Sequence, residues 1–122
     1  MVLVDRVIDG DTLDARDGGT TFRVRLFGVD TAEEGQRCYT EAKARLASLA
    51  TREVRLLPDA RRQDEFGREL RYVFTAAGRS LDAVLVDEGL ATAWREDGDL
   101  RRLLVDLEDA ARAGQRGCLW DD

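Results

Sequence analysis

Apolar and polar residues alternate in short runs along residues 2–30, which is the pattern of β-strands with one buried face. In the clearest run, Phe22, Val24 and Leu26 alternate with two arginines, so the arginines share one face of a strand. Gly28 interrupts this run and indicates a bulge or a close backbone approach. The predicted strands cover residues 2–8, 13–16 and 20–30, with turns at 9–10 and 17–19.

The apolar spacing becomes helical near residue 40, where Ala42, Leu46 and Leu49 recur in an Ala-rich segment. Ser80 is a suitable N-cap for a shorter helix that Gly89 would end. The last helix has the clearest apolar stripe, made of Leu100, Leu103, Leu104, Leu107, Ala110 and Ala111. The predicted helices cover residues 40–50, 80–88 and 100–111, and two further strands cover 53–57 and 68–74.

Five short strands with an interposed helix are typical of a small closed barrel of the OB type. The expected fold class is therefore α+β, mainly β: a five-stranded OB-fold barrel with three α-helices. The length of 122 residues suggests one domain over residues 1–122. No apolar run approaches the roughly 18 residues of a membrane span, and no signal peptide pattern is visible.

Composition restricts the chemistry that the chain can perform. Histidine is absent, which removes imidazole bases, Ser-His-Asp triads and His-bound zinc. The two cysteines cannot supply a four-thiolate site. Carboxylates, arginines and hydroxyls remain, and any metal should be a hard, oxygen-bound cation. The net charge of −6 counts against binding nucleic acid by bulk electrostatics, but not against a local phosphate site.

Four charged segments stand where strands and turns could direct their side chains: Asp9-Gly10-Asp11, Arg25, the segment 30–33 and the segment 64–68. Taken singly, they fit a hairpin turn, a solvated strand residue, a helix cap and a β-turn. A barrel could instead bring them together. Clustered carboxylates would then favour a cation, and two arginines beside it would offer forks for phosphate oxygens.

The segments "VIDGDTL", "VRLFGVDTAE", "EAKARL", "DEFGRELRYVF", "LVDEGLA" and "GCLW" resemble, in order, those of the staphylococcal nuclease (thermonuclease) family. The resemblance extends from about Val4 to Trp120. It implies an OB-fold barrel with three helices and calcium-dependent hydrolysis of DNA and RNA, with single-stranded or locally open substrate preferred. It also implies cleavage of the P–O5′ bond, which leaves 3′-phosphate ends.

The resemblance also assigns a calcium site. Asp11, the second acid of "DGDT", and Asp30 in "VDTAE" match the carboxylate ligands. Thr31 matches a residue that offers its backbone carbonyl. Asp9 matches a residue close to the metal that supports its ligands.

The catalytic residues follow in the same way. Glu33 matches the proposed general base, which activates the attacking water. Arg25 and Arg68 match the two arginines that bind the phosphate and stabilise the transition state. Phe66 stands where a tyrosine often occurs. Phe66 and Trp94 are candidates for stacking on a base, although Trp94 could equally pack against the last helix.

In the family fold the start of the first helix lies near the C-terminal tail, so a disulfide between Cys38 and Cys118 is plausible, the alternative being two buried thiols. A bridge would imply an oxidising compartment and fits a secreted or exported protein, with a cytoplasmic location as the alternative. We expect a monomer that does not bind membranes. The alternative functions are a non-catalytic OB-type module that binds nucleic acid or protein, and a calcium-stabilised structural domain.

Overall fold

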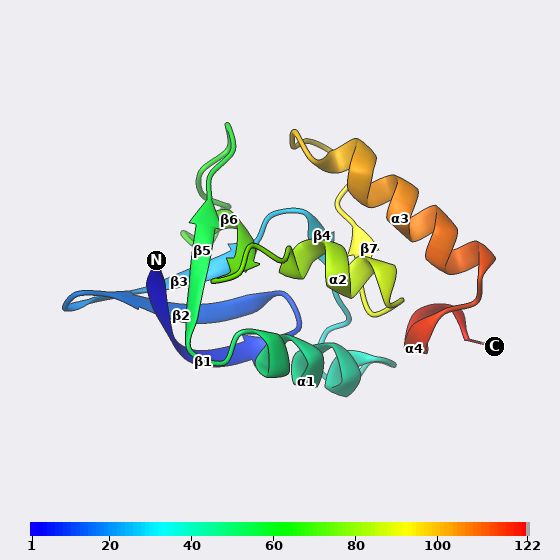
Figure 1. Cartoon of the computed structure of the whole chain (residues 1–122), viewed down its shortest axis with the longest axis horizontal. Helices are drawn as coiled ribbons and strands as arrows, with labels where there is room; N and C mark the ends of the chain where they lie inside the picture. Colours follow the sequence, from blue (N-terminus) through cyan, green and yellow to red (C-terminus); the bar gives the residue numbers. More distant parts are fainter. Residues whose placement is uncertain (122) are drawn as a thin grey trace.

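Seven strands and four helices make up the computed structural model, which describes residues 1–121 (Figure 1). In chain order they are β1 (Val2–Asp9), β2 (Thr12–Asp17), β3 (Thr20–Leu26), β4 (Val29–Asp30), α1 (Tyr39–Leu49), β5 (Glu53–Leu57), β6 (Glu69–Thr75), α2 (Leu81–Asp87), β7 (Thr92–Ala93), α3 (Arg101–Ala113) and α4 (Gly117–Trp120).

Five of the strands close into a barrel in the order β1–β2–β3–β6–β5. All neighbours are antiparallel except β3 and β6, which run parallel and pair Val24 with Glu69. The barrel closes where Val2 of β1 pairs with Val54 of β5. The remaining strands, β4 and β7, form a two-residue antiparallel pair. The predicted fold class, a mainly β five-stranded barrel with helices, is confirmed.

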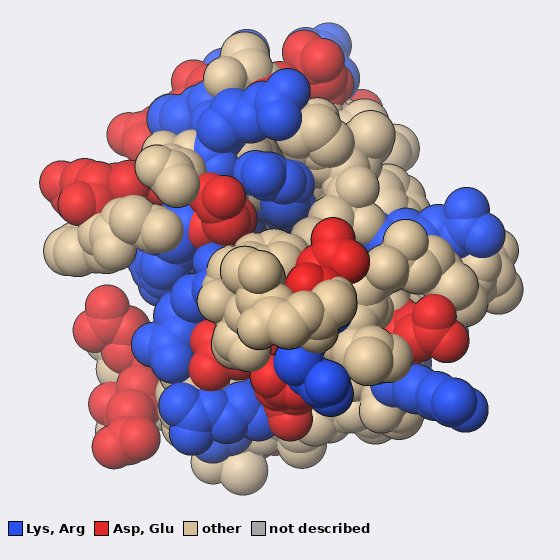
Figure 2. Space-filling view, turned by 90° about the vertical axis from the view of Figure 1, so that its left-hand side faces the viewer, with Lys and Arg blue, Asp and Glu red and all other residues tan. Residues whose placement is uncertain are grey.

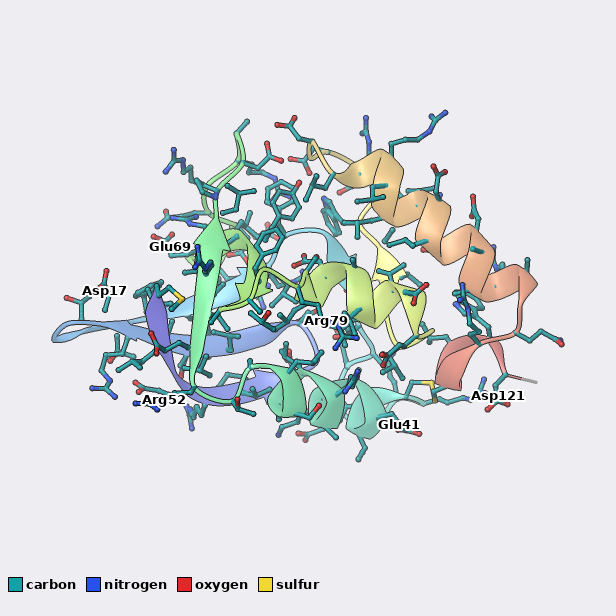
Figure 3. All side chains as sticks on the ribbon, viewed as in Figure 1. Asp17, Glu41, Arg52, Glu69, Arg79 and Asp121 are labelled. Carbon is teal, nitrogen blue, oxygen red and sulfur yellow. A yellow bond between two sulfur atoms is a disulfide. The ribbon has the colours of Figure 1, made fainter. Side chains whose placement is uncertain are left out.

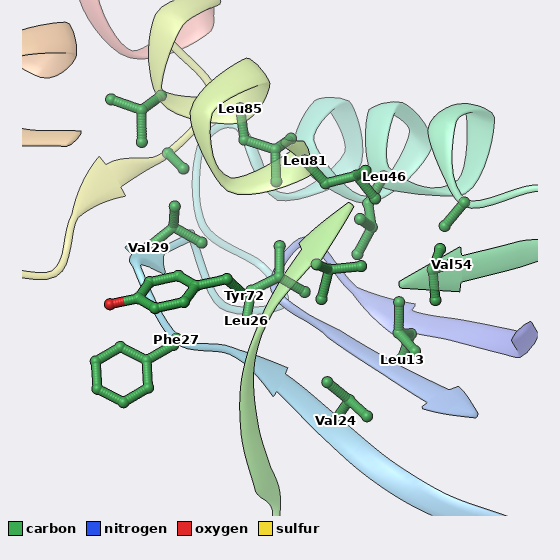
Figure 4. Close-up of a cluster of buried hydrophobic side chains, with 14 of the residues drawn as sticks. Leu13, Val24, Leu26, Phe27, Val29, Leu46, Val54, Tyr72, Leu81 and Leu85 are labelled. Carbon is green, nitrogen blue, oxygen red and sulfur yellow. The ribbon is translucent and has the colours of Figure 1, made fainter. Parts of the chain in front are cut away.

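The core fills the barrel and continues under α1 and α2 (Figure 4). The strands supply Leu13, Val24, Leu26, Val54 and Tyr72, all at most 2% exposed. Leu46 from α1 and Leu81 and Leu85 from α2 cover this cluster and are fully buried. The alternation of apolar residues in the first half of the chain thus marks the inner face of the barrel.

The three predicted helices are present as α1, α2 and α3, with ends that differ from the prediction by a residue or two. Ser80 caps α2 as expected, and its Oγ accepts the N–H of Ala83 at 3.0 Å. In α3 the predicted apolar stripe is too wide, because Leu103 is 54% exposed and Ala110 is also exposed. Leu104 and Ala111 of the stripe are buried, and so is Glu108, whose Oε1 accepts the N–H of Ala93 in β7 at 2.7 Å.

A fourth helix, the four-residue α4, was not expected from the sequence. The glycines around it indicate the end of a helix rather than a further helix. Its backbone is held by the N–H of Leu119, which donates to the carbonyl of Gly89 at 2.9 Å. Trp120 lies against α3, with the guanidinium carbon of Arg112 4.6 Å from its ring centre. No helix within residues 1–121 is long and apolar enough to cross a membrane.

Cys38 and Cys118 form a disulfide that joins the start of α1 to α4 (Figure 3). Their Cα atoms are 5.7 Å apart, and the bridge connects positions 80 residues apart in the chain. The loop between β4 and α1, residues 31–38, therefore ends at a covalent anchor. Asp30, where this loop begins, and Glu33 within it are both candidate site residues.

Candidate active site

Two pockets meet at the open end of strands β2 and β3, and both are lined by Arg25 and Arg68. The first, here called the acidic pocket, has a volume of about 410 Å³ and is lined by Ile8, Asp9, Asp11, Arg25, Asp30, Thr31, Ala32, Glu33, Glu34, Tyr39 and Arg68. The second, here called the aromatic groove, has a volume of about 600 Å³ and is lined by Arg25, Phe27, Arg61, Gln63, Asp64, Glu65, Phe66, Arg68, Leu70, Trp94, Glu96 and Asp97. The structure thus brings all seven predicted metal-site and catalytic residues to one pocket.

The turn between β1 and β2 places Asp11 at the floor of the acidic pocket. A Cβ at Gly10 would lie 2.7 Å from the Cβ of Ala42 and 2.9 Å from the Thr31 hydroxyl oxygen, so only glycine fits. The backbone N–H of Asp11 donates to Asp9 Oδ1 at 3.3 Å, which fixes the turn. Burial, followed by the neighbouring Asp11, raises the pKa of Asp9.

The carboxylate of Asp11 connects three elements of the fold. Its Oδ2 accepts the backbone N–H of Thr31 at 3.2 Å and lies 3.4 Å from Arg25 Nη2. Its Oδ1 accepts the hydroxyl of Thr12 at 2.9 Å. Because Asp11 is only 7% exposed, these contacts supply most of the hydrogen bonds that the buried carboxylate needs.

Arg25 is a buried residue of β3 rather than the solvated strand residue that its sequence context also allowed. Its Nη1 donates to the carbonyls of Leu26 and Val29. Its Nη2 lies 3.4 Å from both Asp11 Oδ2 and Asp30 Oδ1. The guanidinium is therefore fixed to the backbone at one end and placed between two carboxylates at the other.

Asp30 ends β4 and faces the solvent side of the acidic pocket. Its side chain is 60% exposed, yet the surrounding protein partly buries the carboxylate and raises its pKa. Arg25 lowers that pKa, whereas the negative charges of Asp11 and Glu33 raise it further. Asp30 is thus a carboxylate whose ionised form would gain from an added positive charge.

The acidic pocket offers oxygen donors suited to a hard divalent cation. Asp11 and Asp30 both contact the same Arg25 nitrogen, and Thr31, which follows Asp30, lines the same pocket. Within residues 1–121, no cluster of three or more Asp, Glu, Cys or His is close enough to hold a metal by itself. A cation here would rely on this pair of carboxylates, a backbone oxygen and water, a ligand set that calcium accepts.

Arg68 lies across the pocket, in the turn that precedes β6. Asp64 holds it in two ways: Oδ1 accepts the backbone N–H of Arg68 at 2.9 Å, and Oδ2 accepts its Nε at 2.6 Å. Arg68 Nη1 also lies 3.4 Å from the hydroxyl of Thr12. Thr12 therefore connects Arg68 to Asp11, and its hydroxyl is buried between them.

Glu33 projects from the loop between β4 and α1 and is exposed. Its backbone N–H donates to Gln36 Oε1 at 2.8 Å. Among the residues that the structure describes, its carboxylate has no hydrogen-bond partner, so it is free to accept a proton or a water molecule. The loop is anchored at its far end by Cys38 in the disulfide.

The aromatic groove contains both residues predicted to stack on a base. Phe66 is 76% exposed, with the guanidinium carbon of Arg68 5.5 Å from its ring centre. Trp94 is half-buried, and its indole N–H donates to Asp97 Oδ1 at 2.8 Å. The guanidinium carbons of Arg25 and Arg61 lie 5.9 Å and 5.6 Å from the Trp94 ring centre. Trp94 therefore belongs to the groove as well as to the edge of the core.

Charge is mixed rather than separated on one face of the molecule (Figure 2). Figure 2 shows one face on which basic and acidic side chains alternate without a large patch of either sign. Such a surface gives little long-range attraction to a polyanion, in keeping with the net charge of −6. Binding of a phosphate must therefore depend on the local pair of arginines.

Several residues of the site were not predicted from the sequence. Thr12 and Gln36 position Asp11 and the loop of Glu33, but their own types gave no strong chemical signal. Asp64 belonged to the charged segment 64–68, but its part in holding Arg68 was not predicted. Thr12 directly follows Asp11 in "DGDT", so a hydroxyl beside a candidate ligand was the one available hint. Arg61 was overlooked because it lies in a polar, irregular segment that contains several arginines.

The closed barrel, the paired carboxylates and the two arginines define an OB-type domain with a cluster of acidic and basic side chains at one end of the barrel. The family described as staphylococcal nuclease homologue matches residues 23–122. The chain belongs to this family.

Individual relatives extend the match to almost the whole chain. A micrococcal nuclease of Shigella flexneri is 34% identical over 128 residues, covering 98% of this chain and 72% of the relative. A thermonuclease of Staphylococcus intermedius is 36% identical over 127 residues, covering 98% and 75%. Protein ParB of Escherichia coli is 34% identical, covering 98% and 71%. These similarities support a nuclease function for the chain.

Proposed function

We propose that this protein is a calcium-dependent endonuclease that hydrolyses phosphodiester bonds of DNA and RNA. One observation carries the proposal: Arg25 Nη2 lies 3.4 Å from both Asp11 and Asp30, and Thr12 connects this cluster to Arg68. Two fixed guanidiniums beside two carboxylates suit a phosphodiester held next to a cation. The names of the nuclease relatives support the same reaction class.

The acidic pocket fits a calcium ion, which Asp11, Asp30 and the Thr31 carbonyl would hold. When bound, calcium supplies Lewis-acid polarisation of the phosphodiester and a fixed position for water. Asp9 maintains the turn that presents Asp11, through its contact with the Asp11 N–H. Asp11 and Asp30 both border Arg25, so the cation and the arginine would act on the same substrate phosphate.

The protein groups divide the remaining work of hydrolysis. Arg25 and Arg68 would donate N–H groups to the non-bridging phosphate oxygens and stabilise the charge that develops as water attacks. Glu33, whose carboxylate faces the same pocket, would accept a proton from that water. The attack breaks the P–O5′ bond, so one product carries a 3′-phosphate and the other a 5′-hydroxyl.

The aromatic groove would receive a base of the substrate, with Phe66 and Trp94 as stacking surfaces. Bases in a duplex are paired and stacked on their neighbours, so the groove favours single-stranded or locally open nucleic acid. The absence of an extended basic surface on the face in Figure 2 fits local rather than long-range recognition.

The test is cleavage of single-stranded DNA by the purified protein with calcium and then with a chelator. Cleavage should require calcium, and Glu33→Gln should lower the rate roughly 100- to 10,000-fold with an unchanged melting temperature. Glu41→Gln, an equal change on the exposed surface of α1, is the control and should keep the wild-type rate. Binding without products in either condition would favour the non-catalytic binding module instead.

We also propose that the protein works in an oxidising compartment, as a secreted or exported enzyme would. The Cys38–Cys118 disulfide supports this location, because thiol-reducing systems keep such bridges rare in the cytosol. Thiol trapping of the protein in its native cells would test the point. A reduced pair in cells would contradict it.

A further inference from the structure

Arg61 is held in one orientation on the wall of the aromatic groove. Its Nε and Nη2 donate to the two carboxylate oxygens of Asp97, both at 3.0 Å. Its guanidinium carbon lies 5.1 Å from the ring centre of Phe27 and 5.6 Å from that of Trp94. Asp97 also accepts the indole N–H of Trp94, so one carboxylate fixes both the arginine and the aromatic ring beside it. A side chain held in this way loses little further freedom when it binds a ligand.

The pairing with Asp97 leaves one edge of the Arg61 guanidinium available. Arginine has five N–H donors, and this pair uses one on Nε and one on Nη2. Within residues 1–121, Nη1 and the second N–H of Nη2 have no hydrogen-bond acceptor. Together they form a flat fork that matches two neighbouring acceptor atoms.

The charges around the groove argue against a backbone phosphate as the partner of that fork. The charge of Arg61 is already offset by its ion pair with Asp97. Glu65 and Glu96 also line the groove and have no ion-pair partner among the described residues. A phosphate beside Arg61 would meet these uncompensated carboxylates, whereas an uncharged base would not be repelled.

We propose that Arg61 reads guanine in the aromatic groove, which makes this nuclease prefer to cut beside a guanine in single-stranded nucleic acid. The proposal rests on the proposed function and adds its base specificity. Guanine presents two acceptors, O6 and N7, on one edge at the spacing of an arginine fork, and this pairing is the commonest base-specific contact that basic side chains make with DNA. An unpaired base can also stack on the neighbouring aromatic and guanidinium planes while this edge is read.

Mapping of cut positions tests this specificity directly. A single-stranded DNA pool of random sequence is cut with calcium to less than one cut per molecule, and the bases flanking each cut are counted. Wild-type protein should enrich guanine at one fixed position, by roughly 5- to 150-fold over the other bases. Arg61→Gln should abolish the enrichment. Arg61→Lys, which keeps the charge but loses the fork, should also abolish it.

Arg62→Gln is the matched control, because Arg62 is adjacent, exposed and outside the groove, and it should keep the enrichment. Oligonucleotides with a single modified base provide a second check. Hypoxanthine keeps O6 and N7 and should be cut like guanine, whereas 7-deazaguanine lacks N7 and should be cut like the other bases. Melting temperatures of all variants identify any loss that comes from misfolding.

Two outcomes would overturn the proposal while the nuclease function stands. One is calcium-dependent cleavage with no base enriched at any position. The other is an Arg61→Gln variant that cuts every sequence more slowly by the same factor, which indicates a phosphate contact. If the wild type does not cut at all, the proposed function fails, and calorimetric binding of guanosine and adenosine monophosphates still tests Arg61. Equal affinities would then refute the reading of guanine.

Discussion

The two sides of the acidic pocket are built in different ways. On the barrel side, Asp11 and Arg25 are buried and each is held by several hydrogen bonds from strand ends. On the loop side, Glu33 is exposed and only its backbone is held, by Gln36. The residues proposed to bind the cation and the phosphate are thus buried in the fold, whereas the proposed proton acceptor lies on an exposed loop. Stability and activity should therefore be coupled on one side of the pocket and separable on the other.

The largest effect is expected from Arg25→Gln on the barrel side. The change removes the proposed transition-state donor, which should cost roughly 100- to 1,000-fold in rate. It also leaves the buried carboxylate of Asp11 without the positive charge of the Arg25 side chain. This loss should lower the free energy of unfolding by about 3–5 kcal/mol. Single-turnover cleavage and urea denaturation measure the two losses.

Arg23→Gln is the control for that change, since Arg23 lies on the same strand but is exposed and pairs with Asp14. Its ion pair is at the surface, so the control should lose no more than about 1 kcal/mol and no activity. An Arg25→Gln protein as stable as the wild type would show that the two sides of the pocket do not differ as described.

The next effect concerns the covalent anchor of the loop side. Replacing Cys38 and Cys118 together by serine should lower the free energy of unfolding by roughly 4–5 kcal/mol, because the bridge closes a long loop. The barrel side does not depend on the bridge, so the folded variant should keep cleavage within about tenfold at low temperature. Urea denaturation with and without a reductant measures the loss. The reductant should lower the unfolding midpoint of the wild type but not that of the variant. An unchanged midpoint of the wild type would contradict the prediction.

A smaller effect should appear as a pH dependence of stability on the barrel side. Asp82 is fully buried, and its two oxygens accept the N–H groups of Gly28 and Val73 at 3.0 Å. Burial raises its pKa to about 6, only partly offset by these hydrogen bonds. Because the folded-state pKa lies above the unfolded value, the stability contributed by Asp82 is greatest below pH 4 and falls as the pH rises through 6.

Comparison with Asp82→Asn isolates this dependence from the other acids. The stability of wild type relative to the variant should rise by about 2 kcal/mol between pH 7 and pH 4. Chemical denaturation at a series of pH values gives that difference. A difference that stays constant with pH would show that Asp82 titrates alike in the folded and unfolded chain.

Local patterns predicted the barrel strands and the three longer helices, because apolar periodicity depends on neighbouring residues alone. The pair β4–β7 was not foreseen, since two residues carry no periodicity and their pairing is decided by packing around Gly28. A Cβ on Gly28 would lie 2.3 Å from Cδ1 of Leu104, so α3 packs closely against the backbone at this glycine. The burial of Glu108 has the same origin, because its partners Ala93 and Arg95 are brought to it only by the tertiary fold.

The predicted metal-site and catalytic residues share one pocket, but the sequence alone could not give their connections. The four charged segments suggested that carboxylates and arginines lie close together in the fold. The family resemblance supplied the role of each residue. That Thr12 connects Asp11 to Arg68 depends on the register between distant strands. The arrangement of Arg61 with Asp97 depends equally on a contact between segments 36 residues apart.

The parallel pairing of β3 with β6 has a consequence for folding. Arg25 pairs in register with Leu70, two residues after Arg68. The pairing of β3 with β6 therefore brings the two arginines together. Pairings between distant strands carry a large loop-closure cost and tend to form late. A chain that has folded its β1–β3 meander and its helices would be compact but unable to hold a phosphate between both arginines. Recovery of enzymatic activity during refolding should therefore report the closure of the barrel rather than its collapse.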